Sequence, residues 1–163
     1  MELLIEIENS FRDMVKTGKV NLSVLNLLNE LKIKLNESKK NILSSKINIY
    51  DNFPIFHAIE TQIRIIDQML YRVNRAPEIH DNPRVAEDAL VVIPLFKNLH
   101  TNILNKVNDI HYIMNLSSKL QIIAMKNEMY PSSEQITKSV NKEIINDSFG
   151  RFVGNIGEEI DRI

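Results

Sequence analysis

Histidine is the side chain in this sequence best suited to metal binding or proton transfer near neutral pH. The chain has four, His57, His80, His100 and His111, and no cysteine. A di-metal site in a helical bundle needs two Glu-x-x-His pairs and two further glutamates, whereas His57 and Glu60 form a single reversed pair. His100 and His111 would lie about 16 Å apart along one helix, too far for a single ion. We therefore expect surface or boundary histidines, with no metal site and no cofactor.

A second chemical pattern is the segment RAPEIH, residues 75–80, in which four residues separate Arg75 from His80. In an all-helical domain this six-residue segment resembles the Arg-x4-6-His signature of HEPN ribonucleases. The resemblance implies an arginine that stabilises phosphate charge and a histidine that acts in general acid-base cleavage of RNA. Arg75 and His80 are therefore the alternative catalytic site, and a solvated interhelical loop is the simpler interpretation of the segment.

Glycine supplies a third unusual pattern near the end of the chain. Gly150, Gly154 and Gly157 are spaced i, i+4 and i+7 in an expected helix, beside Phe152. Each glycine costs about 1 kcal/mol in a helix relative to alanine. One interpretation is a smooth partner-binding face, formed by Gly150, Phe152, Gly154 and Gly157, where another helix approaches closely. The other is a weak helix that frays or turns at Gly150.

Composition and the absence of known motifs exclude several classes of function. Catalytic triads, Gly-rich phosphate loops and zinc-spaced ligands are absent from the sequence, and no small-molecule substrate is evident. The formal net charge is −1, from 20 basic and 21 acidic residues, and basic residues are not interleaved with aromatic ones. We therefore do not expect nucleic-acid binding. Local charge excesses in residues 21–46 (basic) and 76–96 (acidic) are interpreted as solvated faces.

The N-terminus favours a cytoplasmic protein. Its apolar residues are interrupted by Glu6 and Glu8, unlike a signal peptide. No segment approaches the 18 or so apolar residues of a membrane span, so we expect a soluble chain without membrane insertion. Export by a dedicated secretion system remains open.

Apolar residues recur every three or four positions along most of the chain, which predicts helices. The first spans residues 2–17 and ends at Gly18; the second runs from a cap at Asn21 to about Ser45. Residues 46–53 alternate and favour a short extended piece. A third helix, capped by Asp51 or Asn52, ends near Arg75. The expected stripes of these helices are Leu3, Leu4, Ile7, Phe11 and Val15; Val24, Leu28, Leu31, Leu35 and Ile42; and Phe56, Ile59, Ile63, Ile66, Leu70 and Val73.

The second half of the chain contains the longest apolar pattern. A fourth helix opens at Pro83, and Pro94 predicts a kink or break at about Val92. The stretch Pro94–Met129 is one long helix or breaks best at Asn115–Ser118, where two serines compete for backbone groups. Ser132-x-x-Gln135 is a capping box for a final helix. The inward residues are Ala86, Ala89, Leu90 and Ile93, followed by Phe96, Leu99, Ile103, Val107, Ile110, Ile113, Leu116, Leu120 and Ile123.

These patterns predict an all-α fold, an elongated up-and-down bundle of five or six helices with at least one long helix, as a single domain over residues 1–163. The expected function is that of a non-enzymatic adaptor that binds another protein, or self-associates as a homo-oligomer, through helix faces. One alternative is a HEPN-like RNA-cleaving or toxin-antitoxin component. Another is a pathogen or phage protein that inhibits or redirects a host factor, although no particular residue in the sequence favours this alternative.

Overall fold

The computed structural model describes residues 1–44, 49–78, 80–104 and 110–137 of a chain that forms two compact units, Met1–Tyr130 and Pro131–Ile163. The first unit contains α1 (Glu2–Thr17), α2 (Leu22–Ser44), α3 (Ile49–Arg75), α4 (Asn82–Leu104) and α5 (Ile110–Lys126). The second is described over residues 131–137, where a helix begins at residue 133. The all-α prediction is confirmed, and a single domain over residues 1–163 stays a prediction.

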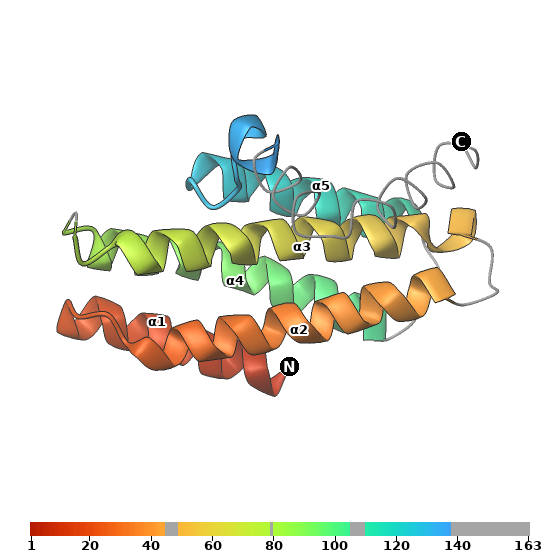
Figure 1. Cartoon of the computed structure of the whole chain (residues 1–163). Helices are drawn as coiled ribbons and strands as arrows, with labels where there is room; N and C mark the ends of the chain where they lie inside the picture. Colours follow the sequence, from red (N-terminus) through yellow and green to blue (C-terminus); the bar gives the residue numbers. More distant parts are fainter. Residues whose placement is uncertain (45–48, 79, 105–109, 138–163) are drawn as a thin grey trace, which may run out of the picture. The chain divides into compact units, whose positions relative to one another are not determined.

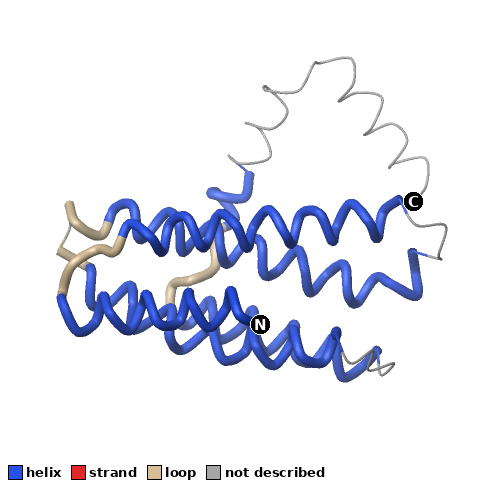
Figure 2. Tube along the Cα trace, turned by 90° about the horizontal axis from the view of Figure 1, so that it is seen from below, coloured by secondary structure: helices blue, strands red, loops and turns tan. Residues whose placement is uncertain are grey.

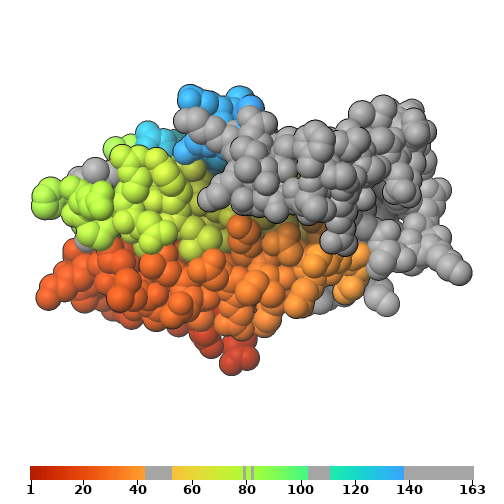
Figure 3. Space-filling view, in the orientation of Figure 1, coloured from red at the N-terminus to blue at the C-terminus, as the bar shows by residue number. Residues whose placement is uncertain are grey.

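Consecutive helices of the first unit pack against each other in the up-and-down order that the sequence predicts (Figure 1). α1 packs on α2 and α4. α2 packs along α3, as the space-filling view shows (Figure 3). α5 contacts α3 and α4 but, among the described residues, neither α1 nor α2. The unit therefore has one layer of α1 and α2, a second of α3 and α4, and α5 alone beyond them. The described loops after α1 and after α3 lie at the same end of it (Figure 2).

Local signals set the helix ends where the sequence places them. Gly18 ends α1 with φ 66°, and its N–H donates to the Met14 carbonyl at 2.9 Å. The Asn21 Oδ1 accepts the backbone N–H of Ser23 at 3.0 Å and caps α2. In the second unit the capping box is also confirmed, because Ser132 and Gln135 exchange side-chain to backbone hydrogen bonds of 2.8 and 3.1 Å.

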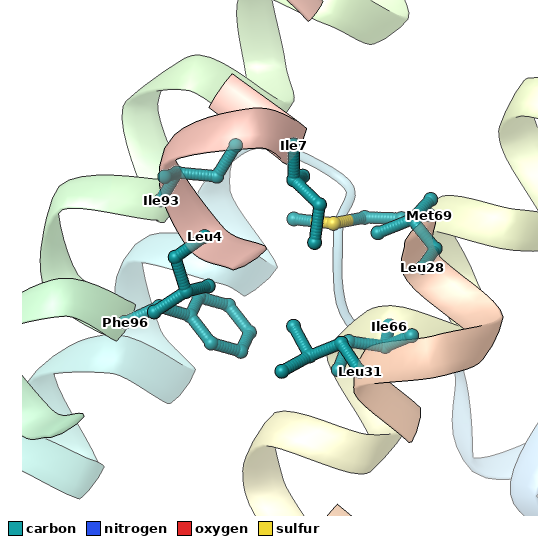
Figure 4. A pocket seen from close by; sticks show the side chains of 8 residues that line it. All are labelled: Leu4, Ile7, Leu28, Leu31, Ile66, Met69, Ile93 and Phe96. Atoms are coloured by element: carbon teal, nitrogen blue, oxygen red, sulfur yellow. The ribbon is translucent and has the colours of Figure 1, made fainter. Parts of the chain in front are cut away.

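The core extends over all five helices. At its centre α1, α2, α3 and α4 each contribute two apolar side chains around a small cavity (Figure 4). Its volume is about 10 Å³, enough for roughly one water-sized sphere, and its walls are entirely apolar, so we expect it to be dry. Ligand pockets are larger by more than tenfold. The cavity is therefore a packing gap and no small-molecule site; it is lined by Leu4, Ile7, Leu28, Leu31, Ile66, Met69, Ile93 and Phe96.

The apolar stretch Pro94–Met129 is two helices, and the predicted break at Asn115–Ser118 is wrong. α4 ends at Leu104, and α5 begins at Ile110 and packs back on α4. α5 continues through Ser117, whose fully buried hydroxyl lies 3.1 Å from the His57 Nδ1. The serine thus has a partner on α3 and does not compete for the α5 backbone.

Of the kink or break predicted at about Val92, the break is wrong, because α4 continues through Pro94 to Leu104. A kink there stays a prediction. Proline in a helix interior costs about 3 kcal/mol. Val92 and Phe96, on either side, are buried, and burying such side chains contributes about 1.5–3 kcal/mol each. Core packing therefore outweighs the missing backbone hydrogen bond.

Two smaller expectations also fail. α3 begins at Ile49, upstream of the expected caps Asp51 and Asn52, so residues 49–53 are helical and not extended; residues 46–48 lie outside the described part. Pro54 removes only one backbone hydrogen bond near the start of α3, and the other hydrogen bonds of this 27-residue helix keep it intact.

In α1, Val15 is exposed and Met14 is buried in its place, because Met14 follows Phe11 by three residues on the inward face.

Replacing Pro94 by alanine should raise the free energy of unfolding by about 1–3 kcal/mol, because alanine restores a donor to the Leu90 carbonyl. Pro83, in the first turn of α4, is the matched control: its N–H would have no helical partner, so Pro83→Ala should be neutral or slightly destabilising. Urea unfolding monitored by circular dichroism measures both. A Pro94→Ala variant less stable than the parent would contradict the expected gain.

Candidate functional site

The alternative catalytic pair, Arg75 and His80, lies at the end of α3 and in the loop that follows. Arg75 is the last residue of α3, and its guanidinium donates to the Tyr71 hydroxyl while lying 5.2 Å over the Tyr71 ring. His80 is exposed in the following loop, with a left-handed φ of 54°. The described residues show no hydrogen bond between the two side chains. The pair stays a prediction without a defined geometry.

One helical turn earlier, Arg72 forms a buried network that the sequence did not reveal. Its guanidinium donates to Asp88 Oδ2 at 2.9 Å, to Asp81 Oδ2 at 3.3 Å and to the Asn127 carbonyl at 3.0 Å. We call these four residues the Arg72 clamp. It joins α3, the loop before α4, α4 itself and the end of α5. The acidic face of residues 76–96 is thus only partly solvated, because Asp81 and Asp88 turn toward a buried cation.

The Arg72 clamp also stabilises the way α5 ends. Glu128 has a left-handed φ of 56°, and the N–H groups of Glu128 and Met129 return to the carbonyls of Met125 and Ala124. This is a Schellman motif with glutamate where glycine is usual. The last carbonyls carry the negative end of the helix dipole, and this negative end stabilises a nearby guanidinium cation. On the surface, Arg84 adds a 3.2 Å ion pair to Glu128.

The arrangement argues for a structural clamp and against a ligand site. Arg72 is almost entirely buried, and its donors already have carboxylate and carbonyl acceptors. A phosphate or carboxylate ligand would have to displace them, which would leave buried carboxylates unpaired. Among the described residues, no group of three or more histidines, aspartates or glutamates is placed to hold a metal ion.

His57 and Ser117 form the pair whose residue types most resemble a base and a nucleophile. The His57 Nδ1 lies 3.1 Å from the Ser117 Oγ, a distance suited to activation of a hydroxyl. Ser117 has no exposed surface, however, so a substrate cannot reach its oxygen. The contact supplies the hydrogen-bond partner that a buried hydroxyl requires.

His100 and His111 lie apart from this pair. His100, on α4, is partly buried, and its Nε2 lies 3.3 Å from the amino nitrogen of Met1. Burial lowers the pKa of His100 below its usual value, and the positive amino terminus adds to the effect. His111, on α5, is exposed. The expectation of surface or boundary positions is confirmed for both.

The predicted partner-binding face of Gly150, Phe152, Gly154 and Gly157 lies outside the described residues, so it stays a prediction. A different apolar surface lies on α5. Met114, Ile122 and Met125 are 41, 53 and 57% exposed, and their spacing of eight and three residues keeps them on one side of a helix. We call these three residues the α5 outer face. The opposite side, with Ile113, Leu120 and Ala124, is buried.

No described helix contains a stretch long and apolar enough to pass through a bilayer. Comparison with protein-family models, curated proteins and solved structures finds no match for the chain.

Replacing Arg72 by methionine keeps most of the side-chain volume and removes the charge. We expect the free energy of unfolding to fall by about 2–4 kcal/mol, because Asp81, Asp88 and the end of α5 lose their shared donor. Arg75→Met on the exposed last turn of α3 is the matched control and should change stability by less than about 0.5 kcal/mol. Equal changes in the free energy of unfolding for the two variants would show that the Arg72 clamp adds no more stability than an exposed arginine.

The lowered pKa of His100 predicts a pH-dependent stability. As pH falls through about 6.5, the unfolded chain binds a proton at this residue before the folded chain does, so acid favours unfolding. Relative to His100→Gln, the parent should lose stability between pH 7.5 and pH 5, and the two should run parallel above about pH 7. Thermal unfolding across this range measures the difference. A pH-independent difference would refute the expected protonation.

Proposed function

We propose that the chain is a non-enzymatic interaction protein that binds another protein through the α5 outer face. The observation that carries the proposal is the exposure of Met114, Ile122 and Met125 on a helix packed alone against the layer of α3 and α4. A helix at the rim of a bundle ordinarily turns polar residues to water. Grouped apolar side chains at such a place are typical of protein interfaces.

The residue types support the same proposal. Methionine is flexible and polarisable, and it is common on surfaces that adapt to a partner helix. Two of the three side chains are methionines, and no charged residue separates them along the face. Ser118, between Met114 and Ile122, is small and lets another backbone approach.

Self-association through another surface is compatible with the proposal, and so is a role in redirecting a host factor. The glycine face stays a prediction of a second contact. RNA cleavage by Arg75 and His80 stays an untested alternative, and no contact within the described residues favours it.

The double variant Ile122→Glu and Met125→Glu should abolish a specific association while leaving the helix content unchanged. Ile33→Glu on α2 and Val91→Glu on α4 are matched controls, because these side chains are 59 and 50% exposed on other helices. Affinity capture from the native cell lysate and analytical ultracentrifugation together measure hetero- and self-association. We expect at least a tenfold loss of the associated chain for the α5 variant only.

Capture of the same proteins by the parent, the controls and the α5 variant would contradict the proposed docking face. So would a parent protein that is monomeric and captures nothing. Circular dichroism of each variant separates a lost contact from a lost fold.

A further inference from the structure

Charge on α5 is one-sided. The helix carries no acidic residue from Ile110 to Lys126. Lys119 and Lys126 are exposed, and neither forms an ion pair with the described residues. Lysines on other helices do form ion pairs with carboxylates: Lys32 lies 2.6 Å from Asp67, and Lys97 lies 2.8 Å from Glu8. Within the described part of the chain, the two lysines of α5 are therefore cations without an ion-pair partner beside an apolar surface.

Helical geometry places these lysines along one edge of the α5 outer face. At 100° per residue, Lys119 and Lys126 project within about 20° of each other, next to Ile122, while Met114 and Met125 project farther round. The separation of seven positions between the two lysines corresponds to about 10.5 Å along the helix axis. The exposed side of α5 is thus a stripe of three apolar side chains, interrupted by the polar His111, Asn115 and Ser118, with a basic edge.

From this pattern we infer that the α5 outer face binds an amphipathic helix whose apolar stripe is flanked by acidic residues, an assignment that rests on the proposed function. Apolar side chains of the partner cover Met114, Ile122 and Met125. Two acidic residues one heptad apart repeat the 10.5 Å spacing of Lys119 and Lys126 when the helices cross at about 20°. The α5 outer face and the partner helix are therefore complementary in two ways: their apolar side chains pack together, and the lysines lie against the acidic residues.

Other occupants fit less well. The α5 outer face of a second copy would bring the same lysines and no carboxylate from α5, so charges would repel across a symmetric contact. A β-strand needs backbone partners that a closed helix cannot give. Helices that lie in membrane surfaces carry many basic residues and large anchors such as Trp, Phe and Leu, whereas this face has two methionines, one isoleucine and a central serine.

The direct test uses the full chain and two synthetic helical peptides of three heptads each. Both have a leucine stripe; one carries glutamate along the flanks and the other carries lysine at the same positions. Fluorescence anisotropy at low salt should show the glutamate peptide binding about tenfold more tightly, with the difference shrinking as salt is added. The variant Lys119→Glu and Lys126→Glu should reverse the preference. Lys16→Glu and Lys40→Glu, on α1 and α2, together form the charge-matched control.

Equal binding of the two peptides, no binding of either, or an unchanged preference in the Lys119 and Lys126 variant would overturn the assignment. Binding to phosphatidylserine vesicles in place of the glutamate peptide would also overturn it and identify a lipid surface. If lysate capture still depends on Ile122 and Met125 in any of these cases, the docking face stands and only the partner chemistry is wrong. If capture does not depend on them, the proposed function itself fails.

Discussion

A single buried guanidinium sets where α5 can end. Arg72 cannot be buried without acceptors, because an unpaired charge in a protein interior costs several kcal/mol. Asp81 and Asp88 supply part of the acceptors from the start of α4, and the Asn127 carbonyl at the end of α5 supplies the rest. The C-terminus of α5 must therefore meet the last turn of α3. Because its position along α3 and α4 is constrained there, the side of α5 that faces outward is constrained as well.

The two sides of the α3 and α4 layer are held by different interactions. Toward α1 and α2 the contacts close around an apolar gap of about 10 Å³, and partly exposed ion pairs such as Lys32 to Asp67 and Lys97 to Glu8 join the helices. Toward α5 the polar contacts include buried groups: His57 to Ser117, Arg64 to the Tyr130 hydroxyl at 3.1 Å, and the Arg72 clamp. Apolar contacts alone would allow α5 to pack in several positions and rotations. Hydrogen-bonded polar contacts of this kind are satisfied in only one of them. A stable outward surface on α5 follows from that selection.

Periodicity in the sequence was enough to predict the helices and most of the core. Of the side chains around the central gap, only Met69 was missed, because the third stripe was assigned to Ile66 and Leu70. Helix breaks failed where tertiary contacts decide the outcome, at Pro94 and at Ser117. The Arg72 clamp could not be foreseen, since its partners lie 9, 16 and 55 residues away. The α5 outer face was missed because the predicted inward stripe left Met114, Ile122 and Met125 without a role. Only the packed bundle shows that these three side chains stay exposed together.

Methionine oxidation in the native lysate tests the central claim most directly, because the α5 outer face contains its own probes. In the purified chain, hydrogen peroxide should convert Met114 and Met125 to sulfoxides quickly and the buried Met69 slowly. In the lysate, a bound partner should slow Met114 and Met125 while the exposed Met1 keeps its rate, as read by mass spectrometry of the captured chain. Equal rates for Met114 and Met125 in both settings would mean that nothing covers this face, and would contradict the docking surface.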